Sequence, residues 1–235
     1  GRMPARPPLQ RDLDRTRADI LRVATEHFTN TGYFGARVDE IAAETATTKR
    51  MIYYCFGSKD GLFAACLSEV YSAIRSFEES LNRDELSPSE AIARYVSETI
   101  RYHEAHPELA LLVRTENLMD AMHLADDGVE PMSRSIVHIL DDVLERGRAT
   151  GEFRSGPTGI ELHVAVSGLA NFRITNAGSI KALFGFAMRD PDRLDHDIDQ
   201  YVAMMLGWLS PLSDRRAEQA GAQRVDVPSL AEATL

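Results

Sequence analysis

Apolar residues recur every three or four positions along almost the whole chain, and the alternation typical of strands is nearly absent. Spacing of this kind is produced by amphipathic helices that turn one apolar face toward a core. We therefore expect an all-α protein. The predicted helices cover residues 11–31, 38–42, 48–56, 59–74, 88–106, 108–122, 136–146, 160–176 and 198–209.

Residue types at the helix ends support several of these boundaries. Ser87 and Glu90 have the spacing of a capping box, and Pro88 is tolerated in the first turn that follows. Ser58 is expected to cap the helix after it. Pro107 interrupts a long apolar pattern, so one helix should end there and another begin.

The last two predicted helices differ in character. The earlier one is rich in small residues, which permit close helix approach, and the last one carries a clean apolar stripe. Two such helices can form a four-helix bundle with a second copy, or they can pair within one chain, and periodicity favours neither. The predicted contact residues of a dimer are Ala165, Gly168, Leu169, Ile198, Val202, Met205, Leu206 and Leu209.

Composition excludes several classes of protein. With 44% hydrophobic and 26% charged residues, the chain is neither collagen-like nor wholly disordered. No stretch reaches the roughly 20 apolar residues that span a bilayer, so we expect a cytoplasmic protein with no membrane partner. Cys55 and Cys66 are too few for a disulfide framework and are not spaced like zinc ligands, so we expect no metal and no cofactor.

Charge is distributed unevenly along the chain. The formal net charge of −10 argues against a uniformly basic nucleic-acid binder. Residues 1–60, however, contain ten Lys or Arg and eight Asp or Glu, whereas the remainder carries 16 basic and 28 acidic residues. This asymmetry favours a small head that faces an anion, attached to an acidic body.

The segment 38–59 holds the most informative pattern. Two short predicted helices with a tight link have the dimensions of a helix-turn-helix, whose second helix enters the DNA major groove. One side of that second helix is apolar, and the other side carries Lys49, Arg50, Tyr53 and Tyr54. These groups suit base edges and phosphates, but tyrosine pairs also pack and a Lys-Arg pair also faces solvent, so geometry alone leaves both interpretations open.

The same segment resembles a known family over about residues 16–67. Gly32 and Tyr33 follow the first helix, Ile41 and Ala42 lie in the second, and residues 48–62 read TKRMIYYCFGSKDGL. A Thr cap, then Tyr-x-x-Phe, then Ser-Lys-acid-x-Leu, in this order, resemble the DNA-binding domain of the tetracycline-repressor (TetR) family of bacterial regulators.

The resemblance implies a transcriptional regulator, usually a repressor, that binds a palindromic DNA operator as a homodimer. It also implies that a small-molecule effector, which binds in the C-terminal body, releases the regulator from its operator. The expected organisation is a disordered arm at 1–12, a helix-turn-helix head at 13–58, an effector-binding and dimerisation domain at 59–211 and a disordered tail at 212–235.

By position, the resemblance implies that Tyr53 and Lys59 contact phosphates and that Thr48 caps the recognition helix. Three departures concern Ala46, where the family commonly has glycine, and Arg50 and Arg37, which replace smaller residues and add charge at the DNA face. The predicted DNA-binding residues are Arg37, Thr48, Lys49, Arg50, Tyr53, Tyr54 and Lys59.

The effector pocket has to be predicted from residue types, because the bodies of the family diverge. A mixture of aromatic and polar groups in residues 91–176 is typical of a ligand pocket. Arg114 and His103 favour an aromatic or lipophilic carboxylate as the effector. The predicted pocket residues are Tyr95, Tyr102, His103, Arg114, Asn117, Phe172 and Asn176.

Two other function classes remain as alternatives. Seven histidines, several near carboxylates, are compatible with a metal-dependent helical-bundle enzyme. No paired Glu-x-x-His set recurs on two helices, and the chain has neither a P-loop nor a G-x-S-x-G turn, so we expect no enzyme and no catalytic residue. The other alternative is a regulator whose body binds a protein partner.

Overall fold

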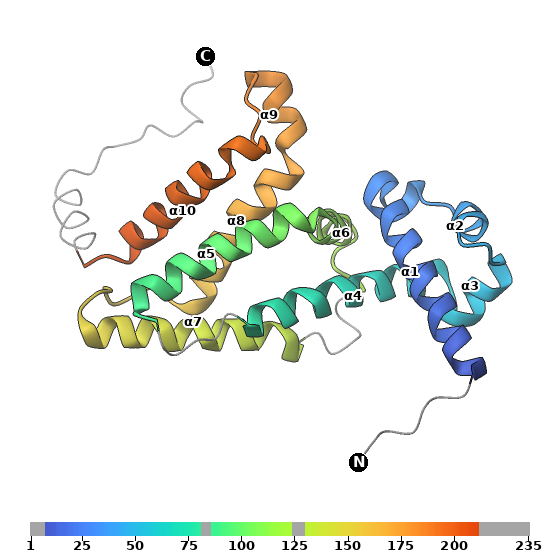
Figure 1. Ribbon diagram of the computed structural model, residues 1–235, viewed down its shortest axis with the longest axis horizontal. Helices are drawn as coiled ribbons and strands as arrows, with labels where there is room; N and C mark the ends of the chain where they lie inside the picture. The colour runs from blue at the N-terminus through green and yellow to red at the C-terminus, as the bar shows by residue number, and fades with distance from the viewer. Residues whose placement is uncertain (1–7, 81–85, 124–129, 212–235) are drawn as a thin grey trace, which may run out of the picture.

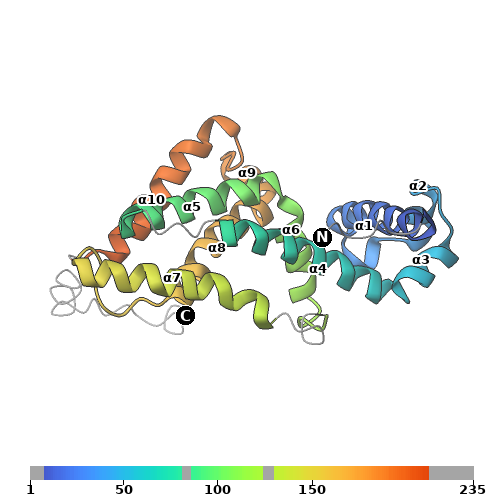
Figure 2. The ribbon, with the colours of Figure 1, turned by 60° about the horizontal axis from the view of Figure 1, so that its bottom comes forward.

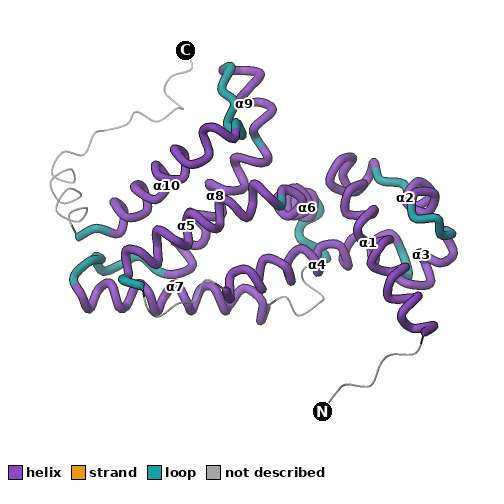
Figure 3. The backbone as a smooth tube through the Cα atoms, in the orientation of Figure 1, coloured by secondary structure: helices purple, strands orange, loops and turns teal. Residues whose placement is uncertain are grey.

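The computed structural model describes residues 8–80, 86–123 and 130–211, and within these ranges all regular secondary structure is helical (Figures 1 and 3). The all-α prediction is confirmed. The elements are α1 (Pro8–Gly35), α2 (Val38–Glu44), α3 (Lys49–Phe56), α4 (Lys59–Ser80), α5 (Pro88–Ala105), α6 (Pro107–Asn117), α7 (Glu130–Thr150), α8 (Gly159–Thr175), α9 (Ala177–Phe184), a 3-10 turn (Pro191–Arg193) and α10 (Leu194–Leu209).

Helices α1 to α3 form a small head at one end of the molecule (Figure 1). Its core joins Phe28 of α1, Ile41 of α2, Ile52 of α3 and Phe63 of α4, all of them completely buried. The first half of α4 therefore belongs to the core of the head, and Leu112 of α6 contributes to it as well. The predicted boundary between residues 58 and 59 separates two helices but does not separate two cores.

The body is built around α5, against which α7, α8 and α10 all pack. Figure 2 shows α7 running along one side of the body and α10 along another, with α5 between them. Buried Arg173 of α8 joins three of these helices, because it donates to Glu104 of α5 at 2.9 Å and to Asp197 of α10 at 2.6 Å. Two carboxylates compensate the one buried guanidinium, as a buried charge requires.

Helix caps lie where the sequence predicts them. Ser87 and Glu90 form a complete capping box at the start of α5, and the N–H of Gly61 donates to the Ser58 hydroxyl at 3.0 Å. These are contacts over three residues, and short-range contacts of this kind can be inferred from the chain alone.

Several predicted element boundaries differ from the structure. Helix α1 begins at Pro8, so residues 8–12 of the predicted arm are helical, while the rest of the arm and the predicted tail lie outside the described residues. Helix α6 ends at Asn117 instead of Met122, because Asp120 and Ala121 adopt positive φ angles. Helix α9 was not predicted, since none of its eight residues is buried and it has no core-facing pattern.

No described helix has the length and hydropathy that crossing a lipid bilayer requires.

Candidate functional site

Helix α3 turns one face into the head and the other away from it. Ile52 is buried, whereas Lys49, Arg50, Tyr53 and Tyr54 are exposed, Tyr54 to 76%. The Thr48 hydroxyl accepts the N–H of Met51 at 3.2 Å and so caps α3. The structure therefore brings five of the seven predicted DNA-binding residues together at one exposed helix.

Ala46 occupies a strained position in the link between α2 and α3. Its φ is 48°, in the left-handed region that favours glycine. The link is a short turn, in which the N–H of Thr47 donates to the carbonyl of Ala42 at 3.1 Å. The head thus keeps the geometry of the turn at the position where the sequence departs from the family pattern.

The cations of the head are engaged to different degrees. Lys49 pairs with Asp39 of α2 at 3.1 Å, and Arg37 lies 3.7 Å from Glu40, with all four side chains exposed. Arg50 makes no ion pair with any described residue. Because exposed pairs are weak, the guanidinium of Arg50 and the two loosely paired cations remain available to an anionic partner.

Lys59 lies deeper than the sequence predicts. Its Nζ donates to the carbonyl of Ala36 at 2.6 Å and stands 4.7 Å from the centre of the Tyr33 ring. Burial lowers the pKa of Lys59, and the neighbouring Asp60 opposes that shift. One of its three N–H donors is used inside the head, so a phosphate contact by the others remains a prediction.

A polar chain, hereafter the head–body link, connects the head to α6 through Tyr33, Asp60, His123 and Glu116. The Tyr33 hydroxyl donates to the Asp60 carboxylate, and burial together with this bond raises the pKa of Tyr33 to about 12. His123 lies 3.7 Å from Asp60 on one side and 2.7 Å from completely buried Glu116 on the other. Its backbone N–H also donates to Glu116 at 2.6 Å.

A cavity of about 200 Å³ lies in the body between α4, α5, α6, α7 and α8. Its apolar lining includes Ile74, Leu109, Val113 and Ile136. Its polar lining consists of Tyr71, Arg75, Glu78, Thr99, His103, His163, Ser167 and Asn171. An apolar pocket with a few converging polar groups is the usual form of a small-molecule site.

The hydrogen bonds of the two cavity histidines indicate which of their ring nitrogens are already engaged. Nδ1 of His103 lies 2.9 Å from the carbonyl of Thr99, to which it can only donate, so its Nε2 is left as an acceptor. Nδ1 of His163 bonds the Tyr95 hydroxyl at 2.9 Å. Burial lowers the pKa of both imidazoles, which are therefore neutral at pH 7.

Of the seven predicted pocket residues, only His103 lines this cavity. Tyr95 lies behind His163, and Tyr102 stacks on Phe77 with ring centres 4.5 Å apart. The other four predicted residues do not line the cavity, because their side chains are exposed or lie at the end of α8. They are Arg114, Asn117, Phe172 and Asn176. Residue type alone did not reveal which face of α6 or α8 turns inward.

Glu78 is one of the cavity residues that the sequence prediction missed. It follows Leu62, Cys66, Val70 and Ile74 at intervals of four, so a carboxyl group stands in the register of an apolar helix face. An acidic residue on the core-facing side of a predicted helix was the signal in the sequence that could have identified Glu78. The structure leaves the residue only 8% exposed, and burial raises its pKa to about 7.

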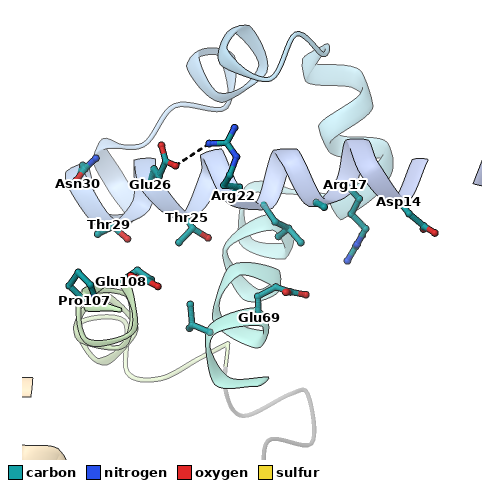
Figure 4. Close-up of a pocket in the computed structure, with 13 residues that line it drawn as sticks. Asp14, Arg17, Arg22, Thr25, Glu26, Thr29, Asn30, Glu69, Pro107 and Glu108 are labelled. Carbon is teal, nitrogen blue, oxygen red and sulfur yellow. Dashed lines mark hydrogen bonds and ion pairs between the residues drawn. The ribbon is translucent and has the colours of Figure 1, made fainter. Parts of the chain in front are cut away.

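A larger cleft of about 670 Å³ lies where the head meets the body, between α1, α4 and α6 (Figure 4). Its two arginines are already engaged: Arg22 bonds Glu26 at 3.1 Å, and Arg17 donates to the carbonyl of Cys55 at 2.8 Å. We regard it as a space between two parts of the molecule, because the smaller cavity is the one with a nearly buried carboxyl that has no partner among the described residues.

Helix α8 exposes an apolar stripe. Ile160, Val164 and Phe172 are 49%, 61% and 48% exposed, and Gly168 completes the spacing of four with open space beside it. A shallow groove runs from this stripe to Met205 and Trp208 of α10. We call this surface the α8/α10 face.

The predicted dimer residues divide between this face and the core. Ile198, Met205 and Leu209 are 3%, 7% and 0% exposed within a single chain, so they belong to its core and offer almost no surface to a second copy. The physical reason is that α10 turns its apolar stripe toward α5. Gly168 is exposed, and Ala165, Leu169, Val202 and Leu206 are half-buried.

The described part of the chain contains no cluster of three or more His, Cys, Asp or Glu side chains arranged to hold a metal ion.

Two family models match the chain. Residues 20–66 match the model described as bacterial regulatory proteins, tetR family, and residues 88–205 match the tetracyclin repressor-like C-terminal domain. The first match covers the head up to the middle of α4, and the second covers most of the body from α5 to α10.

Curated relatives agree with the family models. The HTH-type transcriptional repressor NicS of Pseudomonas putida is 30% identical over 75% of this chain and 84% of its own length. The HTH-type transcriptional repressor SCO4008 of Streptomyces coelicolor is 33% identical over 46% of this chain, which corresponds to about half (53%) of that relative.

Among solved structures, the transcriptional regulator FadR of Bacillus subtilis, determined in complex with stearoyl-CoA, has a similar fold. The TM-score is 0.59 at 18% identity, and the match covers 79% of this chain and 97% of that one.

Proposed function

The chain belongs to the TetR family of bacterial transcriptional regulators, and from this premise we propose that it acts as a homodimeric repressor of a palindromic operator, released by a small effector. It acts by binding alone, without a catalytic step, and in the cytoplasm, where bacterial DNA lies.

The exposed face of α3 carries this proposal. An exposed helix with a capped N-terminus, two cations and two tyrosine hydroxyls is suited to the major groove, where Arg and Lys bind guanine or phosphate and hydroxyls donate to phosphate. Arg50 is the best candidate for base contact, because it is exposed and unpaired among the described residues. Tyr53, Tyr54 and Lys49 flank it as phosphate contacts.

The α8/α10 face is the proposed dimer contact. A stripe of exposed Ile160, Val164 and Phe172 is costly in water, and Gly168 allows two helices to approach closely. A twofold axis at this face would present two α3 helices to successive major grooves, about 34 Å apart on DNA. The palindrome is the expected consequence of that symmetry.

The cavity in the body is the proposed effector site. Helix α4 borders this cavity near its end, through Ile74, Arg75 and Glu78, and its first half packs into the core of the head. A ligand that favours one position of α4 therefore changes the separation of the two heads, and DNA affinity falls by the coupling free energy. The complex of FadR with stearoyl-CoA supports a small-molecule ligand for this fold.

The test is selection of bound duplexes from a random DNA pool by the full-length protein. Enrichment of one palindrome is the expected result. Enrichment of a sequence without twofold symmetry would contradict the dimer, and no enrichment from ligand-stripped protein would contradict DNA recognition by α3.

A further inference from the structure

Glu78 is the only carboxyl group among the described residues that line the body cavity. It is more than nine-tenths buried and makes no hydrogen bond or ion pair with any residue that the structure describes. A buried carboxylate without a partner is unfavourable, since it loses its hydration without compensation. Such a group is retained where something else compensates it.

The neighbouring side chains do not compensate Glu78. Arg75, one turn before it on α4, also borders the cavity but forms no ion pair with it. His103 and His163 face the same space as neutral imidazoles, and Tyr71 is a neutral phenol at pH 7. No cation of the described chain is therefore bonded to the Glu78 carboxylate.

Two further groups on the wall have unused hydrogen-bonding capacity. Nε2 of His103 is left as an acceptor, and the buried hydroxyl of Thr99 has no partner among the described residues. With the Glu78 carboxylate they give the cavity three groups that can accept hydrogen bonds, beside the aliphatic side chains of Ile74, Leu109 and Val113.

We propose that the cavity binds a small ligand with a basic nitrogen, an amine, an amidine or a protonated ring nitrogen, whose N–H groups donate to the Glu78 carboxylate. The apolar part of the ligand lies against Ile74, Leu109 and Val113. A cavity of about 200 Å³ limits the ligand to the size of one ring with a short side chain. This ligand class replaces the carboxylate expected from Arg114, which lies exposed on α6.

The position of Glu78 on α4 gives the contact a regulatory consequence, which rests on the function proposed above. The same helix begins at Lys59, whose ammonium bonds the carbonyl of Ala36 in the head. A cation that binds Glu78 therefore acts directly on the helix that supports the head.

The experiment compares three probes of similar shape, benzylamine, benzyl alcohol and benzoate, by titration calorimetry with the full-length protein at pH 7. We expect benzylamine, which is protonated at this pH, to bind roughly tenfold or more tightly than the other two. Glu78→Gln removes that advantage and leaves benzyl alcohol unchanged. Glu69→Gln is the matched control, because it removes an exposed carboxylate from the same helix outside this cavity.

A second readout needs no variant and therefore holds even if Glu78→Gln does not fold. Pairing with a cation favours the ionised form of the Glu78 carboxyl group, so benzylamine binding should release protons into solution. The number of protons released is measured by repeating the titration in buffers of different ionisation enthalpy. Benzoate binding as tight as that of benzylamine, proton uptake on benzylamine binding, or no binding of any probe at millimolar concentration would overturn the inference.

Failure of this inference is distinguishable from failure of the proposed function, because the calorimetry contains no DNA. Glu78-dependent binding of benzylamine by a protein that selects no duplex would retain the ligand class and reject the regulator. Selection of a palindrome by a protein that prefers benzoate would retain the regulator and reject the ligand class.

Discussion

Single residues of this protein hold conformations and charges that the fold makes unfavourable. Ala46, with φ at 48°, has a Cβ where glycine would avoid steric strain. Glu78 has a nearly buried carboxyl group without a partner among the described residues. Each is a local cost at a place that the proposed function uses, the recognition turn and the cavity, and such costs are typical of functional sites.

Ala46→Gly should stabilise the protein. Glycine relieves the left-handed strain, which exceeds the entropy cost of glycine, so the free energy of unfolding should rise by about 0.5–1 kcal/mol. Urea denaturation measures this change. Ala43→Gly, in the exposed part of helical α2, is the control and should lower stability by about 1 kcal/mol. Equal losses in both variants would contradict the strain at Ala46.

Glu78 should make stability depend on pH. Its pKa is about 7 in the folded protein against 4.5 in a free side chain, so the unfolded chain ionises first as the pH rises. The stability contribution is complete below pH 4.5, declines between pH 4.5 and 7, and is lost above, a change of about 3 kcal/mol. Glu78→Gln should therefore gain that amount relative to the wild type between pH 4 and 8.

Urea denaturation at a series of pH values tests the Glu78 prediction. The difference between Glu78→Gln and wild type should grow only across the window from pH 4.5 to 7, whereas Glu69→Gln, at an exposed site on the same helix, should give a flat difference. A flat difference for Glu78→Gln would mean that its carboxyl is solvated in the folded protein.

At the scale of the helix, the sequence predicts those features that depend on residues three or four positions apart. Helix periods and the caps at Ser58 and Ser87 were predicted correctly, because each depends on residues within one turn. The cap at Thr48, which the family resemblance implies, is also present. The neighbour against which each helix face packs was not predictable in this way. Arg114 and Asn117 of α6 have the residue types of a pocket, but the packing of α6 against α1, α4 and α8 turns them outward.

Helix α8 carries the prediction for the dimer. Val164 is 61% exposed in one chain, so Val164→Glu should leave the fold intact, yet it would bury a charge between two copies at the α8/α10 face. We expect dissociation to a monomer in sedimentation analysis, a loss of roughly 2–4 kcal/mol of association energy. Leu118→Glu, at an apolar position after α6 that is 77% exposed, should remain dimeric. A dimeric Val164→Glu protein would place the interface elsewhere.

The head–body link predicts a strong energetic coupling between α6 and the loop after it. His123→Ala leaves completely buried Glu116 without its imidazole partner and should lower the free energy of unfolding by about 2–3 kcal/mol. In a double-mutant cycle with Glu116→Gln, the two losses should be far from additive. Additive losses would show that the two side chains act independently.

At the scale of the whole molecule, the central feature is a small head on an acidic body. A net charge of −10 opposes DNA, so recognition depends on the few cations that the head exposes. The body contributes geometry, since α4 joins the head to the cavity. In the proposed dimer, the α8/α10 face would set the distance between two heads. The sequence predicted this division from charge and motif, whereas the cavity depends on five helices that only the fold brings together.

The most direct measurement is titration of the selected palindromic duplex, by fluorescence anisotropy over a range of salt concentrations, with wild type, Arg50→Ala and Arg114→Ala. Both arginines are exposed, but only Arg50 lies on α3. We predict that Arg50→Ala weakens binding roughly tenfold or more, and that it flattens the salt slope by about 0.9 per head if Arg50 contacts phosphate, while Arg114→Ala matches the wild type. Equal affinity of all three proteins would contradict recognition by α3.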